Sequence, residues 1–99
     1  DEYGLGRPHV IEGEFGFHMW YSIRCKSIPY RLGYAFSEDG LNWARLDKQI
    51  GLTVSREGWD SDMVYANSIC ETKYGTYMFY NGNDYGKSGF GYALLDGKL

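Results

Sequence analysis

An internal repeat of nearly sixty residues is the feature that most limits what this chain can fold into. The segment from Arg7 to Ala35 aligns with the segment from Ala66 to Ala93. The matched positions are Gly16 with Gly75, Met19 with Met78, Tyr21 with Tyr80, and Gly33-Tyr34-Ala35 with Gly91-Tyr92-Ala93. A spacing this long exceeds one hairpin and suits a four-stranded sheet with one long connection.

Apolar alternation broken by short turns predicts an antiparallel meander in each copy. In the first copy we expect strands over residues 7–12, 15–24, 30–37 and 42–47. In the second copy we expect strands over 64–72, 74–82 and 89–95, after which the chain stops before a fourth strand. The predicted organisation is a first unit over 1–50, a connecting loop over 51–63 and an incomplete second unit over 64–99.

Both faces of the expected strand over residues 15–24 are apolar. Phe17, Met19 and Tyr21 lie on one face, while His18 and Trp20 lie on the other. A lone antiparallel sheet exposes a polar face to water, so two apolar faces imply a sheet covered on both sides. Four-stranded sheets stacked around an axis form a β-propeller. The predicted fold class is therefore all-β, with two four-stranded antiparallel propeller blades, the second lacking its last strand.

Two blades cannot close a ring, because propellers have about four to eight blades. We therefore expect this chain to be part of a larger propeller or to complete one as a homo-oligomer. The faces left uncovered in isolation would be apolar and adhesive.

Charge and composition exclude several classes of function. The net charge of -3 and the scattered Lys and Arg residues argue against a nucleic-acid partner. No apolar run approaches the roughly 20 residues of a membrane span, and no leader pattern is present, so we expect a soluble chain with the cytoplasm as the default compartment. Cys25 and Cys70 belong to no Cys/His cluster, so neither a metal site nor a cofactor is predicted.

The clearest short motif, Ser37-Glu38-Asp39-Gly40-Leu41-Asn42-Trp43, predicts a structural turn. Asp39 can accept hydrogen bonds from turn amides, Gly40 can adopt a positive φ, and Trp43 can pack against the hairpin. It resembles the Asp-box hairpins of sialidase-type propellers. In a meander this turn lies at the opposite end of the sheet from the connecting loop.

Strand alternation also predicts which loops meet. In an up-and-down sheet the connection into the first strand and the loop between the second and third strands share one end. Residues 59–62, 24–31 and 81–88 should therefore cluster, and they define the candidate functional face.

Candidate catalytic residues on this face are Asp60 and Asp62. Cleavage of a glycosidic bond requires two carboxylates, one as acid and one as nucleophile or base. The alternative is that acids in a Gly-rich loop cap turns or face water.

Six further residues are candidates for substrate binding. Trp59 and Tyr65 could offer flat apolar surface to a sugar ring or could pack one blade against the other. Arg7 and His9 lie on the expected inner strand and could contact hydroxyls, although His9 could equally be a structural histidine. Asn81 and Asn83 belong to an amide-rich loop that we interpret as a polar rim.

Taken in order, several motifs resemble the predicted glycosidases related to glycoside hydrolase families 32 and 43. The motifs are Arg7-Pro8-His9-Val10-Ile11, Met19-Trp20-Tyr21-Ser22, Gly33-Tyr34-Ala35 followed by the Asp-box, Gly58-Trp59-Asp60-Ser61-Asp62-Met63 and Met78-Phe79-Tyr80-Asn81-Gly82. The resemblance implies two consecutive blades of a five-bladed propeller whose active site draws three acids from different inner strands.

The same resemblance assigns roles to individual positions and shows where this chain departs from the pattern. Asp62 matches the acid that precedes Met in the relatives, where Glu is usual. Arg7-Pro8 matches an inner-strand site but carries no carboxylate, and Asn67 replaces a common Pro. A full catalytic set is therefore not present in this chain alone.

The predicted function is a glycosidase-like fragment that binds carbohydrate on the face bearing the connecting loop. Hydrolysis would require acids from other blades, with Asp62 as the acid and Asp60 or Arg7 tuning its charge. The alternative is a non-catalytic module that binds sugar or assembles with further copies of itself.

Overall fold

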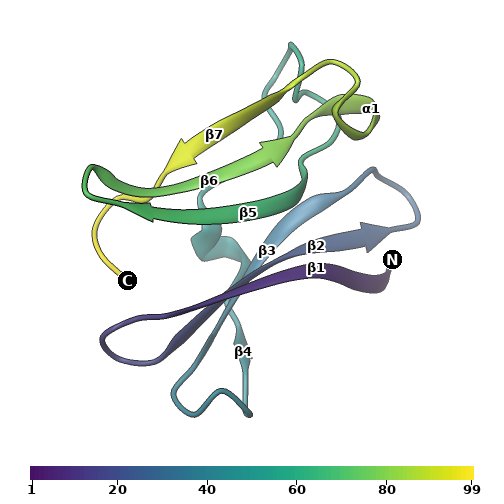
Figure 1. Ribbon diagram of the computed structural model, residues 1–99. Coiled ribbons are helices and arrows are strands. Elements are labelled where there is room, and N and C mark those ends of the chain that lie inside the picture. Colours follow the sequence, from purple (N-terminus) through teal and green to yellow (C-terminus); the bar gives the residue numbers. More distant parts are fainter.

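The computed structural model describes residues Asp1 to Leu99 and contains two antiparallel sheets (Figure 1). The first sheet has the order β1 (Glu2–Glu12), β2 (Phe17–Cys25), β3 (Arg31–Ser37) and β4 (Ala44–Arg45), and the short helix η1 (Asp47–Ile50) follows it. The second sheet has the order β5 (Tyr65–Thr72), β6 (Gly75–Asn81) and β7 (Phe90–Leu94), with the helical turn α1 (Asn83–Gly86) between β6 and β7. Neither helix is long and apolar enough to cross a membrane.

These sheets confirm the predicted all-β class and the two meanders of four and three strands. The strand ends lie within two residues of the prediction except at the start of the first strand, and the expected strand over 42–47 is much shorter than predicted. β1 begins at Glu2, because the chain before Arg7 also pairs with β2, and β4 has only two residues. Neither sheet closes on itself, and the assembly of such sheets into a propeller remains a prediction.

The sequence repeat is also a repeat of strand register. Equivalent cross-strand pairs are Met19 with Ala35 and Tyr21 with Gly33 in the first sheet, and Met78 with Ala93 and Tyr80 with Gly91 in the second. Because direct partners lie on the same face of a sheet, the repeated residues occupy equivalent places in both sheets.

The first strand of each sheet carries a bulge at the same repeat position. The register shifts between Gly6 and His9 in β1 and between Tyr65 and Ser68 in β5. Arg7, with φ 52°, and Ala66, with φ 60°, are the aligned residues at these shifts. A positive φ is uncommon for residues other than Gly, so its occurrence at both sites shows that the two copies share backbone detail.

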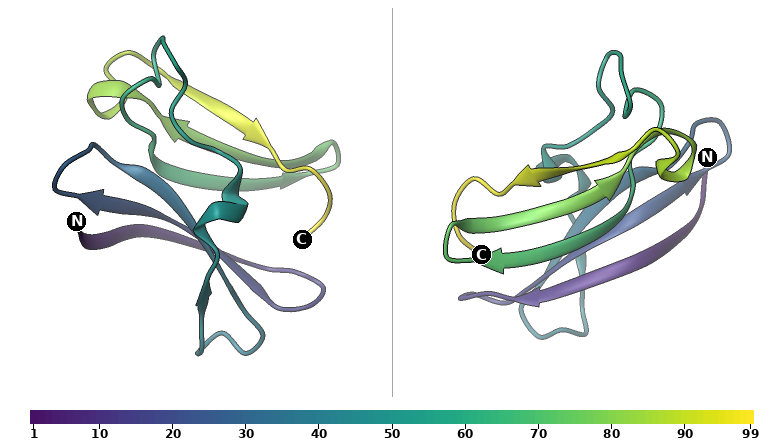
Figure 2. Two further views of the ribbon diagram at one scale, coloured as in Figure 1. Left: turned by 180° about the vertical axis from the view of Figure 1, so that it is seen from behind. Right: turned by 45° about the horizontal axis from the view of Figure 1, so that its top comes forward.

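The two sheets pack face to face as layers, and the segment between η1 and β5 crosses from one layer to the other (Figure 2). Trp20 and Leu32 of the first sheet contact the second sheet, and Val64, with no exposed surface, lies in the same cluster. The second sheet contributes Ile69, Met78 and Tyr80. This interface forms the main hydrophobic core.

The two sheets do not use equivalent faces at this interface. Met78 and Tyr80 correspond to Met19 and Tyr21, whereas Trp20 corresponds to Phe79. Successive residues of a strand point to opposite faces. The first sheet therefore packs through the face that carries Trp20. The second sheet packs through the opposite face of the repeat, the one that carries Met78 and Tyr80.

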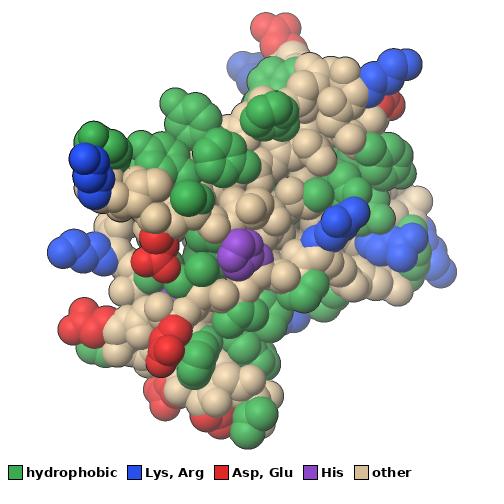
Figure 3. Space-filling view, viewed as in Figure 1, with side chains coloured by type: hydrophobic (Ala, Val, Ile, Leu, Met, Phe, Trp, Pro, Cys, Tyr) green, Lys and Arg blue, Asp and Glu red, His purple; other side chains and the backbone are tan.

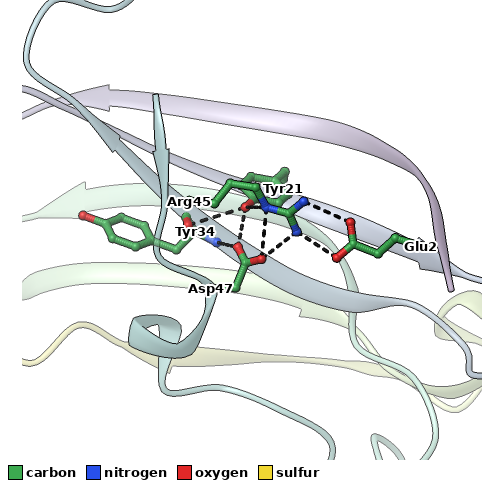
Figure 4. A network of polar contacts seen from close by, with 5 residues as sticks. All are labelled: Glu2, Tyr21, Tyr34, Arg45 and Asp47. Carbon is green, nitrogen blue, oxygen red and sulfur yellow. Dashed lines mark hydrogen bonds and ion pairs between the residues drawn. The ribbon is translucent and has the colours of Figure 1, made fainter. Parts of the chain in front are cut away.

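A polar network ties the strands of the first sheet together (Figure 4). Arg45 contacts both carboxylate oxygens of Glu2, at 3.0 and 2.9 Å, and approaches Asp47 at 2.6 Å. The Asp47 carboxylate accepts hydrogen bonds from the Tyr21 hydroxyl and, at 3.1 Å, from the Tyr34 amide. Burial, followed by this contact with Asp47, raises the pKa of Tyr21 to about 12.

Solvent limits what this network contributes to stability. The side chains of Arg45 and Glu2 are each 43% exposed. Exposed ion pairs of this kind contribute about 0–1 kcal/mol. The network therefore positions η1 against β3 more than it stabilises the chain.

The Asp-box turn folds as the sequence predicts. The Asp39 carboxylate accepts hydrogen bonds from the amides of Leu41 and Asn42, both at 2.8 Å, and Gly40 has φ 78°. Trp43 packs against the second hydrophobic cluster, formed by Tyr21, Ile23 and Ala35. Hydrogen bonds from Asn42, Leu41 and Ser37 hold the pKa of Asp39 well below its usual range.

We predict that Asp39 contributes stability at neutral pH that is lost in acid. A carboxyl group whose pKa is lower in the folded state stabilises that state above its unfolded pKa of about 3.9 and loses the contribution as pH falls towards the folded pKa. The difference in free energy of unfolding between the wild type and Asp39→Asn should therefore shrink below about pH 4. Urea unfolding from neutral pH to about pH 3 measures it.

Asp96→Asn serves as the matched control, because Asp96 is exposed and its side chain forms no hydrogen bond in the structure. A difference between wild type and Asp39→Asn that stays constant with pH would contradict the role assigned to the Asp-box carboxylate.

Candidate functional site

The three loops predicted to cluster do meet at one end of the molecule. Arg31 donates a hydrogen bond to the carbonyl oxygen of Asp62 at 2.8 Å, and the amide of Asp62 donates to the Asn83 side chain at 2.7 Å. The rings of Tyr30 and Tyr85 lie 6.0 Å apart. These contacts confirm that the loop after β2, the loop before β5 and the loop after β6 form one surface.

Asn83 holds the connecting loop in place and has no capacity left for a ligand. Its Oδ1 accepts hydrogen bonds from the amides of Asp62 and Met63, at 2.7 and 3.0 Å. Its Nδ2 donates to the Gly58 carbonyl at 3.1 Å and to the Ser61 hydroxyl at 3.2 Å. An amide side chain has two donors and two acceptor positions, and all four are occupied here. Asn83, a sequence candidate for substrate binding, is therefore a structural residue.

The structure separates the two candidate acids. Asp60 is only 6% exposed, and its Oδ2 accepts a hydrogen bond from the Tyr80 hydroxyl at 3.2 Å. Burial first, and then the contact with Asp60, raises the pKa of Tyr80. Asp62 is exposed, and its carboxylate has no hydrogen-bond or ion-pair partner. Asp60 and Asp62 do not form an exposed carboxylate pair.

Trp59 packs against one face of the second sheet. Its ring stacks on Tyr80 with 5.4 Å between ring centroids. It also lies where a Cβ on Gly82 or Gly91 would be, so side chains at these two positions would displace it. The packing alternative for Trp59 is the one that the structure shows.

His9 and Arg7 lie on β1, beside the first strand of the second sheet. The Nδ1 of His9 accepts a hydrogen bond from the amide of Ile69 at 3.0 Å, so this ring joins β1 to β5. The Arg7 carbonyl accepts a longer hydrogen bond, 3.4 Å, from the Asn67 side chain. The Arg7 side chain is exposed and forms no hydrogen bond. His9 thus has the structural role, and Arg7 alone is free for a ligand.

Three tyrosines from three different segments form an aromatic cluster on the candidate face. Tyr30 lies 4.6 Å from Tyr65, and Tyr65 lies 5.5 Å from Tyr85, measured between ring centroids. Tyr85 is 63% exposed. It follows Asp84, and both residues have left-handed φ angles, 59° and 54°, in the α1 turn. We call Tyr30, Tyr65 and Tyr85 the tyrosine cluster.

The sequence predicted Tyr65 but missed Tyr30 and Tyr85. Both missed tyrosines belong to the loops predicted to meet, so an inventory of aromatic residues in those loops would have found them. Asn81, the remaining candidate, ends β6, and its side chain lies against Gly86 without a hydrogen bond.

Arg31 is a third residue of this face that the sequence analysis missed. Its guanidinium donates to the carbonyl oxygens of Pro29, Tyr30 and Asp62, at 3.0, 3.1 and 2.8 Å. The Tyr30 carbonyl also accepts a hydrogen bond from the Val64 amide at 3.2 Å. These bonds hold the backbone that presents Tyr30 and Asp62, so Arg31 acts as a positioning residue.

A cavity of about 310 Å³ lies elsewhere, between the sheets beside η1. It is lined mainly by apolar residues, among them Trp20, Ile50, Leu52 and Met78. None of the sequence-predicted site residues lines it. The cavity and the candidate face are therefore different features.

Comparison with known proteins gives relatives without a described activity. The chain is 39% identical over 90 residues to the uncharacterised protein Rv1502 of Mycobacterium tuberculosis, an alignment that covers 91% of this chain. MT1551, an uncharacterised protein from another strain of that organism, is likewise 39% identical over 90 residues. The chain spans only 29% of the length of each. No family model and no solved structure matches the chain.

We predict that Asn83→Ala destabilises the protein by about 2 kcal/mol, because it removes four hydrogen bonds that each contribute about 0.5–1.5 kcal/mol and are partly replaced by water. Asn81→Ala is the matched control, since this neighbouring asparagine forms no side-chain hydrogen bond. Chemical denaturation measures both variants. Equal stability of the two variants would contradict the role assigned to Asn83.

Proposed function

We propose that the candidate face binds carbohydrate, with the tyrosine cluster as its contact surface and Asp62 as its polar group. The observation that supports the proposal most directly is the convergence of Tyr30, Tyr65 and Tyr85 from three segments, on the face whose loops also carry the unpaired carboxylate of Asp62. Aromatic rings with one apolar surface and one polar end suit ligands that are themselves apolar on one side and hydroxyl-rich on the other.

Asp62 would bind sugar hydroxyls. Its carboxylate is exposed and unpaired, so it can accept two or more hydrogen bonds without breaking an existing contact. Its backbone is held on both sides, by Asn83 at the amide and by Arg31 at the carbonyl. A fixed backbone lowers the entropy cost of binding.

Hydrolysis would need an acid that this chain does not present. Asp60 is buried and bonded to Tyr80, so it does not supply the second exposed carboxylate that glycosidic cleavage requires. The resemblance of the Gly58-to-Met63 motif to glycosidases of the families 32 and 43 supports a catalytic assembly in which further blades place a carboxylate about 5–10 Å from Asp62.

The burial of Asp60 favours the second candidate function, a non-catalytic carbohydrate-binding module. In that case the chain binds a sugar with the same residues and releases it unchanged. The two candidates share the binding surface and differ only in turnover.

We predict that Tyr85→Ala weakens sugar binding by at least about tenfold, or about 1.4 kcal/mol, because it removes the most exposed ring of the cluster. Calorimetric titration with arabino-, xylo-, fructo- and manno-oligosaccharides measures the affinity. Tyr74→Ala is the matched control, since Tyr74 is 75% exposed in the turn between β5 and β6, away from the cluster. An equal loss of affinity in both variants, or a wild type that binds none of these sugars, would remove the proposal.

We predict that Asp62→Asn weakens binding and that neither it nor the wild-type 99-residue chain releases a product sugar. Chromatography of the oligosaccharides after prolonged incubation measures turnover. Turnover by the wild type that Asp62→Asn abolishes would establish hydrolysis by this chain. Turnover that survives in Asp62→Asn would exclude Asp62 as the acid.

A further inference from the structure

The outward face of the second sheet is apolar and uncovered. Direct cross-strand partners place Phe79 beside Tyr92 and Tyr77 beside Leu94 on this face. Phe90, Tyr92 and Leu94 are 72%, 65% and 58% exposed. In the space-filling view hydrophobic side chains gather where β6 and β7 run (Figure 3). We call this set, Tyr77, Phe79, Phe90, Tyr92 and Leu94, the outer face.

The first sheet has an apolar groove of its own. Among its lining residues, Tyr21 and Ala35 are already buried at 3% exposed each, whereas Leu5 is 52% exposed. The groove has a volume of about 360 Å³ and is lined by Leu5, Pro8, Met19, Ala35 and Trp43, with Tyr21 and Arg45 at its polar edge. It lies on the side of the first sheet that faces away from the second sheet, because Met19 and Tyr21 have the opposite parity to Trp20. Each sheet therefore has one apolar side that packs against no other sheet, although Tyr21, Ile23 and Ala35 on the first sheet are buried within the chain.

The internal repeat shows that these two faces correspond to the interface inside the molecule. Phe79 of the outer face corresponds to Trp20, and Tyr92 corresponds to Tyr34. Trp20 belongs to the core between the two sheets, and Tyr34 packs against that core. The outer face thus carries the residues that the repeat uses to pack onto a neighbouring sheet.

The groove corresponds to the face that the second sheet contributes to the same interface. Met19 and Ala35 of the groove correspond to Met78 and Ala93, which receive the first sheet in the observed core. An outer face placed in a groove would therefore repeat the packing already present between the two sheets. The backbone supports the equivalence, since both sheets share strand register and the bulges at Arg7 and Ala66.

The molecule also has a larger accessible surface than expected for a compact monomer of its mass. Its accessible surface is 6600 Å². A compact monomer of this mass exposes about 5800 Å² by the usual scaling of surface with mass. The polar residues next to the outer face, Ser68 and Cys70, carry no charge that would oppose contact. The excess surface is of the size that one further sheet contact would bury.

We propose that the outer face of one copy of this chain docks into the groove of a second copy. The contact is head-to-tail, because it joins two different faces, and it extends the observed stacking of sheets. A head-to-tail contact forms a ring when the rotation per copy closes and an open chain when it does not. The docking is independent of carbohydrate binding, because neither face includes the tyrosine cluster or Asp62.

Sedimentation velocity of the full 99-residue chain tests the proposal. The wild type should form species of two or more copies as its concentration rises. Tyr92→Glu in the outer face and Leu5→Glu in the groove should each weaken association by more than about 100-fold, because each would bury an unpaired charge. Leu41→Glu, at a side chain 84% exposed in the Asp-box turn, is the matched control and should associate like the wild type.

Mixing the two interface variants distinguishes head-to-tail docking from its alternatives. Tyr92→Glu retains an intact groove and Leu5→Glu retains an intact outer face, so together they should form a one-to-one complex that neither forms alone. Circular dichroism should show the wild-type spectrum for each variant. A monomeric wild type, association of either variant with itself, or failure of the folded variants to form the mixed complex would overturn the proposal.

Discussion

The packing of the two sheets around Val64 is the interaction on which the rest of the structure depends. Trp20 and Leu32 from one sheet meet Ile69, Met78 and Tyr80 from the other, and this contact forms the main core of a small chain. Neither sheet has a sufficient core by itself, since a single sheet leaves one apolar face in water. The same interface joins non-equivalent faces of the repeat, which is why each sheet keeps one side that packs against no other sheet.

The candidate face follows from this packing rather than from any single motif. Stacking the sheets brings together three loops that are far apart in sequence, and Asn83 and Arg31 then hold the connecting loop through its backbone. Side chains that remain free, above all Asp62 and Tyr85, are therefore displayed on a supported backbone. Loops supported by a rigid sheet are where binding residues concentrate in proteins.

The sequence pattern predicted those features well whose stabilising contacts lie between residues close together in the chain. The strand positions followed from alternation to within two residues, apart from the start of β1. The Asp-box followed from a carboxylate that bonds amides two and three residues away. Pattern could not decide between roles that depend on distant partners. His9 bonds an amide sixty residues away, and Asp60 bonds a hydroxyl twenty residues away. A histidine or an aspartate in a loop has the same sequence signature whether it binds a ligand or the protein itself.

The sequence by itself determined the all-β class, the two meanders, the repeat that relates them and the set of loops that share one end. These depend on side-chain alternation and turn chemistry, which are properties of neighbouring residues. Only the tertiary structure decided which of the candidate residues are free. Burial and hydrogen-bond partners across the two sheets occupy Asp60, Trp59, His9 and Asn83, and they leave Asp62 and the tyrosine cluster at the surface.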